Sequence, residues 1–262
     1  MSSFTFDPGI DIRPNPLESD FIYGEDVFGP KVENRRLDDI RSSLNDSSCN
    51  GPEIVYSIAM DVGKKKDREI LITQDLLFGV VRYSEGKLGN TPVRSQGHSH
   101  KVSPLSGWST PEVYEIWSGK AIIYMQEFGE EHPGRCYAVE AFAGDVVIVP
   151  PLWIHATISA DPAQALVFGA WCVRDYGFDY DKVRQRRGIA WYPEYNNENH
   201  IVWRPNIHYS RSNLICKTPA DYTAFGLSKG KSIYSTFESS PQTFLYVPHP
   251  ETRQELWHEF EP

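Results

Sequence analysis

Between residues 53 and 173 the chain consists of short runs rich in β-branched and aromatic residues, separated by turn signals. Runs of this kind are typical of strands, and the pairs Glu85-Gly86, Pro133-Gly134 and Asp161-Pro162 indicate turns between them. The runs predict strands at 53–62, 69–73, 77–83, 92–100, 112–117, 121–126, 136–141, 146–149, 155–159 and 165–173. This spacing favours an all-β fold, an antiparallel sandwich or barrel of the jelly-roll kind that binds a ligand in its mouth.

The regions on either side of these strands predict other structures. Residues 1–30, rich in Pro, Gly and Asp, indicate an extended arm over the core or a partner subunit. Leu37, Ile40 and Leu44 have helical spacing, which predicts a short helix at 34–44 with Asn34 as its cap, and another is expected at 179–187. Beyond residue 188, many aromatics predict an irregular extension packed on the barrel or a second subunit. The expected parts are an arm with a short helix (1–50), a barrel (51–187) and an extension (188–262).

The composition argues against several classes of partner. A net charge of -9 and a pI near 5.4 disfavour a duplex-binding surface, which needs clustered Lys and Arg, so no nucleic-acid partner is expected. The N-terminus lacks a basic segment followed by an apolar run, and the apolar stretch 146–154 contains prolines and is too short to span a bilayer. We therefore expect a soluble, cytoplasmic protein without a membrane partner.

The cysteines do not form a recognisable metal or disulfide pattern. They lie far apart, with no Cys-x-x-Cys pair, and we interpret them as reduced buried thiols. The four residues are Cys49, Cys136, Cys172 and Cys216.

Histidines and a glutamate in two strand-like segments indicate a metal site. His98 and His100 alternate along a strand and therefore point to the same face. Glu112 follows in the same segment, and His155 lies about forty residues further on. Three nitrogen donors and one carboxylate suit Fe, Mn, Zn or Ni rather than Ca or Mg. Four side chains would leave coordination positions open, which is typical of a catalytic site. We interpret the other histidines, His132, His200, His208, His249 and His258, as surface residues.

These segments resemble the two motifs of the cupin superfamily. The first motif is matched by Gly97 to His100, then Glu112, then Gly119, and the second by Gly144, Pro150 and His155. The six residues between Glu112 and Gly119 favour Glu112 over Glu115 as the ligand. Two features depart from the pattern: the loop 101–111 is an insertion, expected at the barrel mouth, and Leu152 stands where the second motif has glycine.

Within the cupins, the chain resembles the archaeal-type, metal-dependent glucose-6-phosphate isomerases over about residues 30–190. The segments that carry the resemblance are 86–89, 95–100, 111–114, 149–155 and 175–180, with weaker matches at 35–38 and 55–56. The resemblance implies interconversion of glucose 6-phosphate and fructose 6-phosphate by an enediolate or a hydride shift.

The resemblance also implies roles for individual residues. Ser95 and Gly97 would bind the phosphate, Tyr56 and Tyr114 the sugar, and Glu112 with Tyr114 would be catalytic. The metal, with iron as the first candidate, would be held by His98, His100, Glu112 and His155. A homodimer is the expected assembly.

Three positions depart from this family, and two other functions stay open. Val80-Val81, Cys172 and Phe178 stand where family members have threonine, tyrosine and histidine, respectively. The same ligands would suit a non-haem iron dioxygenase, another cupin enzyme, because open positions can take O₂ and a substrate. They would also suit a non-catalytic sugar-binding cupin, since a fold alone does not specify a function.

Overall fold

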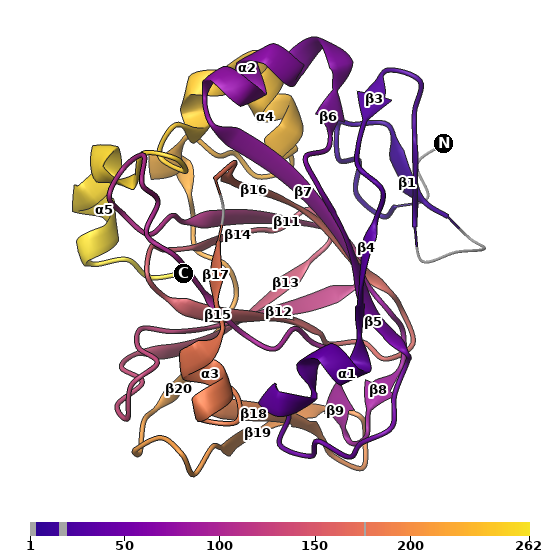
Figure 1. The fold of residues 1–262 in the computed structure, drawn as a ribbon, viewed down its shortest axis with the longest axis vertical. Coiled ribbons are helices and arrows are strands. Elements are labelled where there is room, and N and C mark those ends of the chain that lie inside the picture. Colours follow the sequence, from indigo (N-terminus) through magenta and orange to yellow (C-terminus); the bar gives the residue numbers. More distant parts are fainter. Residues whose placement is uncertain (1–3, 16–19, 176) are drawn as a thin grey trace.

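Two sheets face each other in the centre of the molecule (Figure 1), and their strands pair antiparallel except for β20, which runs parallel to β13. The computed structural model describes residues 4–15, 20–175 and 177–262. The larger sheet has the order β14 (Val146–Val149), β11 (Glu112–Ser118), β16 (Leu166–Val173), β7 (Leu76–Tyr83), β5 (Ile54–Met60) and β4 (Glu33–Arg36). The smaller has the order β15 (Ile154–Ser159), β12 (Lys120–Gln126), β13 (Cys136–Phe142) and β20 (Leu214–Lys217). This non-sequential order confirms the predicted jelly roll, although within the described residues the two sheets stay separate instead of closing into one hydrogen-bonded barrel.

The space between the sheets is filled by the inward-facing side chains of both. Tyr56, Ile116 and Phe168 come from the larger sheet and Ile123 and Val139 from the smaller, and all five are buried in one cluster. Because side chains alternate along a strand, every second residue of these runs enters the interior. Burying a side chain of this size stabilises the fold by about 1.5–3 kcal/mol.

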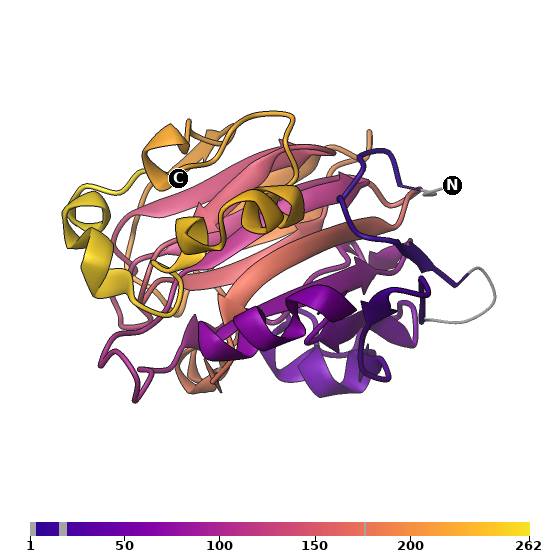
Figure 2. The ribbon, with the colours of Figure 1, turned by 90° about the horizontal axis from the view of Figure 1, so that it is seen from above.

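The outer face of the larger sheet is covered by both ends of the chain. Phe4, in the N-terminal arm, packs at 5.3 Å from Trp117 between ring centroids, and Phe237 of α4 (Ile233–Ser239) packs at 4.7 Å from Trp171. Figures 1 and 2 show α4 and α2 (Arg68–Thr73) over this sheet, with α5 (Gln254–His258) beyond its edge. The aromatic residues of the extension therefore serve as a cover for the core.

The outer face of the smaller sheet is covered by α3 (Asp181–Gln185) and by the hairpin of β18 (Trp191–Tyr195) and β19 (Ile201–Pro205). Tyr124 of β12 contacts Trp203 of β19 at 5.8 Å between ring centroids. The extension is thus more regular than predicted, because it forms this hairpin, the strand β20 and two α-helices.

Short elements connect these layers. The strands are β1 (Ile12–Pro14), β2 (Phe21–Tyr23), β3 (Val27–Phe28), β6 (Gly63–Lys64), β8 (Lys87–Leu88), β9 (Thr91–Pro92), β10 (Ser99–His100) and β17 (Phe178–Asp179). The helices are α1 (Leu37–Ile40) and the 3₁₀ turns η1 (Arg41–Ser43), η2 (Lys65–Asp67), η3 (Thr223–Phe225), η4 (Pro241–Phe244) and η5 (Pro250–Arg253). The arm predicted at 1–30 lies over the core wherever it is described, and its residues 1–3 and 16–19, like Tyr176, lie outside the described residues.

One expected element was of the wrong type, and another was helical as predicted but began later and had a different cap. The run 69–73 is the helix α2, whose start follows the turn η2 and whose acidic Glu69 suits a helix N-terminus. Only Leu71 of α2 is buried, while Ile72 is 52% exposed. The first helix is α1, which begins at Leu37; Asn34 lies in β4 and accepts a hydrogen bond from Ser57, so it is not the cap.

The run 92–100 is not one continuous strand. It is paired only at its ends, in β9 and β10, and by single bridges of Arg94 with Ile158 and His98 with His155. Gly97, at a φ of +93°, interrupts the extended backbone between these bridges. The division of the chain at residues 50 and 187 stays a prediction. Among the described residues, no helix combines the length and the apolar character needed to cross a membrane.

Candidate metal centre

Four residues from three adjoining segments converge inside the jelly roll. Glu112 is the first residue of β11, His155 lies in β15, His98 is bridged to His155, and His100 lies in β10. One ligand atom from each of these side chains lies within 4.8 Å of the other three. The inward face of each strand and the bridge to β15 therefore bring together residues that are far apart in the sequence.

All three histidines direct the same ring nitrogen, Nε2, toward the centre of this four-residue cluster. The Nε2 atoms of His98, His100 and His155 are buried and lack a well-aligned hydrogen-bond partner among the residues that the structure describes. His100 Nδ1 lies 2.8 Å from the carbonyl oxygen of Thr110, and His155 Nδ1 lies 3.2 Å from that of Trp153. Because a carbonyl oxygen only accepts, these contacts put the proton on Nδ1 and leave the lone pair on Nε2. Buried polar atoms without partners are costly, and a cation would satisfy all three.

Glu112 completes the group. Its Oε2 lies 3.3 Å from the Nε2 atoms of both His100 and His155 and accepts a hydrogen bond from the Tyr114 hydroxyl at 2.8 Å. Its Oε1 accepts one from the Cys172 thiol at 3.2 Å. Burial alone would raise the pKa of Glu112, but its contacts with the two histidines hold that pKa well below its usual value. The carboxylate is therefore ionised.

Burial works against a positive charge on two of the histidines, His98 and His155. Burial, reinforced by the neighbouring rings, lowers the pKa of His98 well below its usual value, and burial also lowers the pKa of His155. Neutral imidazoles and an ionised carboxylate are the forms that bind a divalent cation. The donor set of three nitrogens and one carboxylate thus fits a transition metal in a site with room for further ligands.

Glu115, the other acidic residue of β11, points to the opposite face. Its carboxylate accepts hydrogen bonds from the backbone N–H of Ile233 at 2.7 Å and from Trp117 Nε1 at 3.0 Å. Burial raises the pKa of Glu115 to about 8. Strand alternation therefore assigns one glutamate to the metal centre and the other to the packing of α4.

Comparison with known sequences decides the family. The chain matches the family described as Glucose-6-phosphate isomerase (GPI) over residues 40–211. The chain belongs to the glucose-6-phosphate isomerase family. This match agrees with the family resemblance that the motifs predicted.

Relatives of this family share modest identity with the chain. A putative glucose-6-phosphate isomerase 1 of Rhizobium meliloti (strain 1021) is 31% identical over 117 residues, 45% of this chain and 50% of its own. The matched stretch thus spans about half the length of this relative. The glucose-6-phosphate isomerase of Pyrococcus abyssi is 27% identical over 199 residues, 74% of this chain and 96% of its own. A solved structure of recombinant oxalate oxidase in complex with glycolate is similar over 48% of this chain and 54% of its own, with 11% identity and a TM-score of 0.36.

Ser95 and Gly97, the residues expected at the phosphate end from the family resemblance, both have close neighbours. Ser95 is buried, and its hydroxyl oxygen already accepts a hydrogen bond from the backbone N–H of Thr157 at 3.0 Å. Gly97 packs closely, since a Cβ there would lie 2.9 Å from Ile189. Of the two valines noted above, Val80 belongs to the outer cluster, while Val81 packs in the interior and is half-buried.

Several aromatic residues and one arginine lie beside the ligands. The ring of Phe178 lies 4.4 Å and that of Tyr180 lies 5.5 Å from the His98 ring, between centroids. Tyr56 stacks on Tyr83 at 4.8 Å. Arg35 faces the same interior, because its register partner in β5 is Tyr56. The only sequence signal for Arg35 was its place in the weak match at 35–38.

The inserted loop 101–111 is tied to the second motif. The Ser109 hydroxyl donates a hydrogen bond to the carbonyl oxygen of His100 at 2.8 Å and accepts one from the backbone N–H of Leu152 at 3.0 Å. Leu152 has a φ of +72°, a left-handed conformation that favours glycine. The loop thus supports the position at which the family pattern has glycine.

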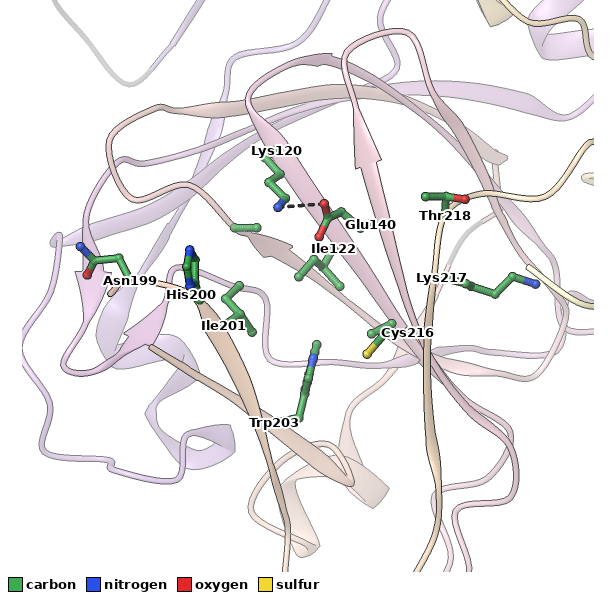
Figure 3. Close-up of a pocket in the computed structure, with 12 residues that line it drawn as sticks. Lys120, Ile122, Glu140, Asn199, His200, Ile201, Trp203, Cys216, Lys217 and Thr218 are labelled. Carbon is green, nitrogen blue, oxygen red and sulfur yellow. Dashed lines mark ion pairs between the residues drawn. The ribbon is translucent and has the colours of Figure 1, made fainter. Parts of the chain in front are cut away.

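A separate hollow of about 560 Å³ lies on the outer face of the smaller sheet (Figure 3). It is lined by strands β12, β13 and β20 and by the β18–β19 hairpin, and Lys120 pairs with Glu140 at 2.8 Å beside it. None of the four candidate ligands lines this hollow, so it is distinct from the metal centre.

Proposed function

We propose that this protein is a metal-dependent aldose–ketose isomerase that interconverts glucose 6-phosphate and fructose 6-phosphate. The proposal is carried by three buried Nε2 atoms, which have no hydrogen-bond partner among the described residues, converging with the Glu112 carboxylate inside the jelly roll. The chain that carries them belongs to the glucose-6-phosphate isomerase family. An isomerase of this type moves hydrogen between neighbouring carbons, and it needs a site that tolerates negative charge on the sugar oxygens.

His98, His100, Glu112 and His155 would hold the metal. A bound divalent ion supplies Lewis-acid stabilisation of charge on the C1 and C2 oxygens. Iron is the first candidate, with manganese, zinc and nickel as alternatives, because the same donors accept each of them.

Glu112 and Tyr114 would carry out the proton transfer of the isomerisation. Burial, followed by the charge of Glu112, raises the pKa of Tyr114 well above its usual value, so its hydroxyl stays protonated and donates to Glu112 Oε2 at 2.8 Å. Glu112 Oε2 can accept a proton, while the Tyr114 O–H can donate to a sugar oxygen, which is the division of labour that an enediolate route requires. The lowered pKa of Glu112 makes it a weak base, and a hydride shift therefore remains the alternative route.

Tyr56, Ser95 and Gly97 complete the proposed substrate site. Tyr56 projects from β5 into the interior and stacks on Tyr83, which fits a contact with the sugar. Ser95 and Gly97 stand three residues and one residue before His98, so a phosphate held there would lie near the metal. A phosphorylated hexose is accordingly the proposed substrate, and a homodimer in the cytoplasm stays a prediction.

A coupled assay tests the proposal. Fructose 6-phosphate is supplied to the purified protein, and glucose 6-phosphate is measured before chelation, after chelation and after iron, manganese, zinc or nickel is restored. We expect turnover that disappears with the chelator and returns with a metal. Oxygen uptake without sugar isomerisation would identify a dioxygenase instead, and metal-dependent sugar binding without turnover would identify a binding protein.

A further inference from the structure

Two arginines, Arg35 and Arg184, lie around Tyr180, whose ring neighbours that of His98. Arg35 lies in the edge strand β4 and is paired with Tyr56, so it lies on the inward-facing side of the larger sheet. Its side chain is 29% exposed, while its Nε atom is buried and has no hydrogen-bond partner within the described part of the chain. A half-buried guanidinium with an unused donor is available to a ligand.

Tyr180 links this arginine to the histidines. Arg35 and Arg184 both interact electrostatically with the Tyr180 hydroxyl. The Arg184 guanidinium lies over the Tyr180 ring, 5.0 Å from its centroid, and its Nε donates to Gln96 at 3.0 Å. Because the Tyr180 ring is itself 5.5 Å from that of His98, the two guanidinium groups lie on the side of the site that carries Gln96 and His98.

The uncharged residues at this end cannot balance a phosphate monoester. Ser95 and Gly97 can supply hydrogen-bond donors but no positive charge. A phosphate dianion is bound most strongly by a planar, bidentate arginine. Arg35 interacts with the Tyr56 side chain and forms an ion pair with Glu33. The Glu33 side chain is 66% exposed, and exposed ion pairs of this kind contribute little, so a ligand can replace Glu33.

We propose that Arg35 is the cationic anchor for the substrate's phosphate, with Arg184 as a weaker second cation across Tyr180. This inference rests on the proposed function for the position of the sugar. Under this proposal, Arg35 determines the preference of the site for phosphorylated over unphosphorylated sugars. Arg184 is more exposed than Arg35 and already bonded to Gln96, so its contribution is the smaller one.

Calorimetric titration of the purified full chain, in a buffer free of phosphate, tests the anchor. The probes are inorganic phosphate, fructose 6-phosphate and fructose, and the variants are Arg35→Gln, Arg35→Lys and Arg184→Gln. Arg36→Gln is the matched control, because Arg36 is the exposed neighbour that pairs with Glu53. Arg35→Gln should weaken phosphate and fructose 6-phosphate binding by about ten- to a hundredfold and leave fructose unchanged. Arg35→Lys should keep part of the affinity and Arg184→Gln should lose less.

The outcomes separate this inference from the proposed function. Phosphate binding that depends on Arg35 in a protein without isomerase activity would support the anchor and reject the isomerase. Isomerase activity whose KM for fructose 6-phosphate is the same in Arg35→Gln and Arg36→Gln would reject the anchor and keep the isomerase. Equal losses for fructose and fructose 6-phosphate would also overturn the anchor. Thermal unfolding of each variant confirms that the comparison is made on folded protein.

Discussion

Ser109 and Leu152 are joined by a hydrogen bond of 3.0 Å between the Ser109 hydroxyl and the Leu152 backbone N–H. The bond connects the inserted loop to a turn in which Leu152 has the left-handed φ of +72°. The two departures from the family pattern are therefore physically coupled: the insertion supplies a partner to the residue that replaces glycine.

Replacing Leu152 with glycine should stabilise the protein by about 1 kcal/mol. Glycine adopts a positive φ without the steric cost that leucine bears, and the Leu152 side chain is 64% exposed, so little buried surface is lost. Ser109→Ala should destabilise by about 1–3 kcal/mol, because the Leu152 N–H and the His100 carbonyl lose their partner. Because glycine keeps the backbone N–H, Ser109→Ala should cost as much in the Leu152→Gly background as in the native chain. Urea unfolding of both single variants and the double variant measures this, and a clearly smaller cost in the glycine background would contradict the bond to the backbone.

Removing a histidine of the cluster should abolish metal retention without unfolding the jelly roll. His98→Ala and His155→Ala each delete one donor, and we expect metal affinity to fall by more than about a hundredfold. His132→Ala, at an exposed loop position, is the matched control. Elemental analysis of the dialysed proteins and circular dichroism give the result, and unchanged metal content or turnover in either cluster variant would refute the site.

Changing Glu112 or Tyr114 should separate metal binding from chemistry. Glu112→Gln is expected to lower kcat more than it lowers metal occupancy, because the amide keeps a donor oxygen but accepts no proton. Tyr114→Phe removes the hydroxyl that donates to Glu112 Oε2 and should lower kcat by about a hundredfold at full occupancy. Measuring kcat and bound metal on the same preparations shows whether each residue acts in metal binding or in the chemical step. Equal losses of both quantities in Glu112→Gln would reduce Glu112 to a ligand.

The buried Glu115 should make stability depend on pH. Its pKa in the folded chain is about 8, above the ordinary value of 4.5, so between these values the folded state holds a proton that the unfolded state has lost. The contribution of this group to stability therefore declines as pH rises from about 4.5 to 8. Urea midpoints of the native protein and of Glu115→Gln should diverge across that window, in favour of the variant at higher pH. Glu69→Gln, at an exposed site, should follow the native curve.

Local alternation explains which parts of the fold were predictable. The runs that became β5, β7, β11 to β13 and β16 show inward and outward positions that a sequence reveals directly. The short run at Ile70 to Ile72 fits both a strand and a helix, and only the burial of Leu71 against the sheet selects the helix. The type of an element is thus predictable where its hydrophobic pattern extends over enough residues to distinguish a strand from a helix.

The site was predictable to the extent that its residues lie in motifs. His98, His100, Glu112 and His155 stand at spacings that carry chemical meaning by themselves. The place of Arg35 depends on the pairing of β4 with β5, and the role of Ser109 depends on a turn 43 residues away. Such relationships arise from long-range packing, which one sequence does not display.

The strand β20 has a consequence for the behaviour of the chain at high concentration. It lies parallel to β13 and occupies the N–H and C=O groups that β13 would otherwise present at the edge of the smaller sheet. Open edges of this kind recruit strands from other molecules. With β20 in place, the exposed edge of the smaller sheet is a short strand that ends at Lys217. In the larger sheet, the edge strand β4 carries the charged residues Glu33, Arg35 and Arg36. The C-terminal extension therefore acts as a guard against aggregation, and a protein shortened before Leu214 would be expected to self-associate through β13.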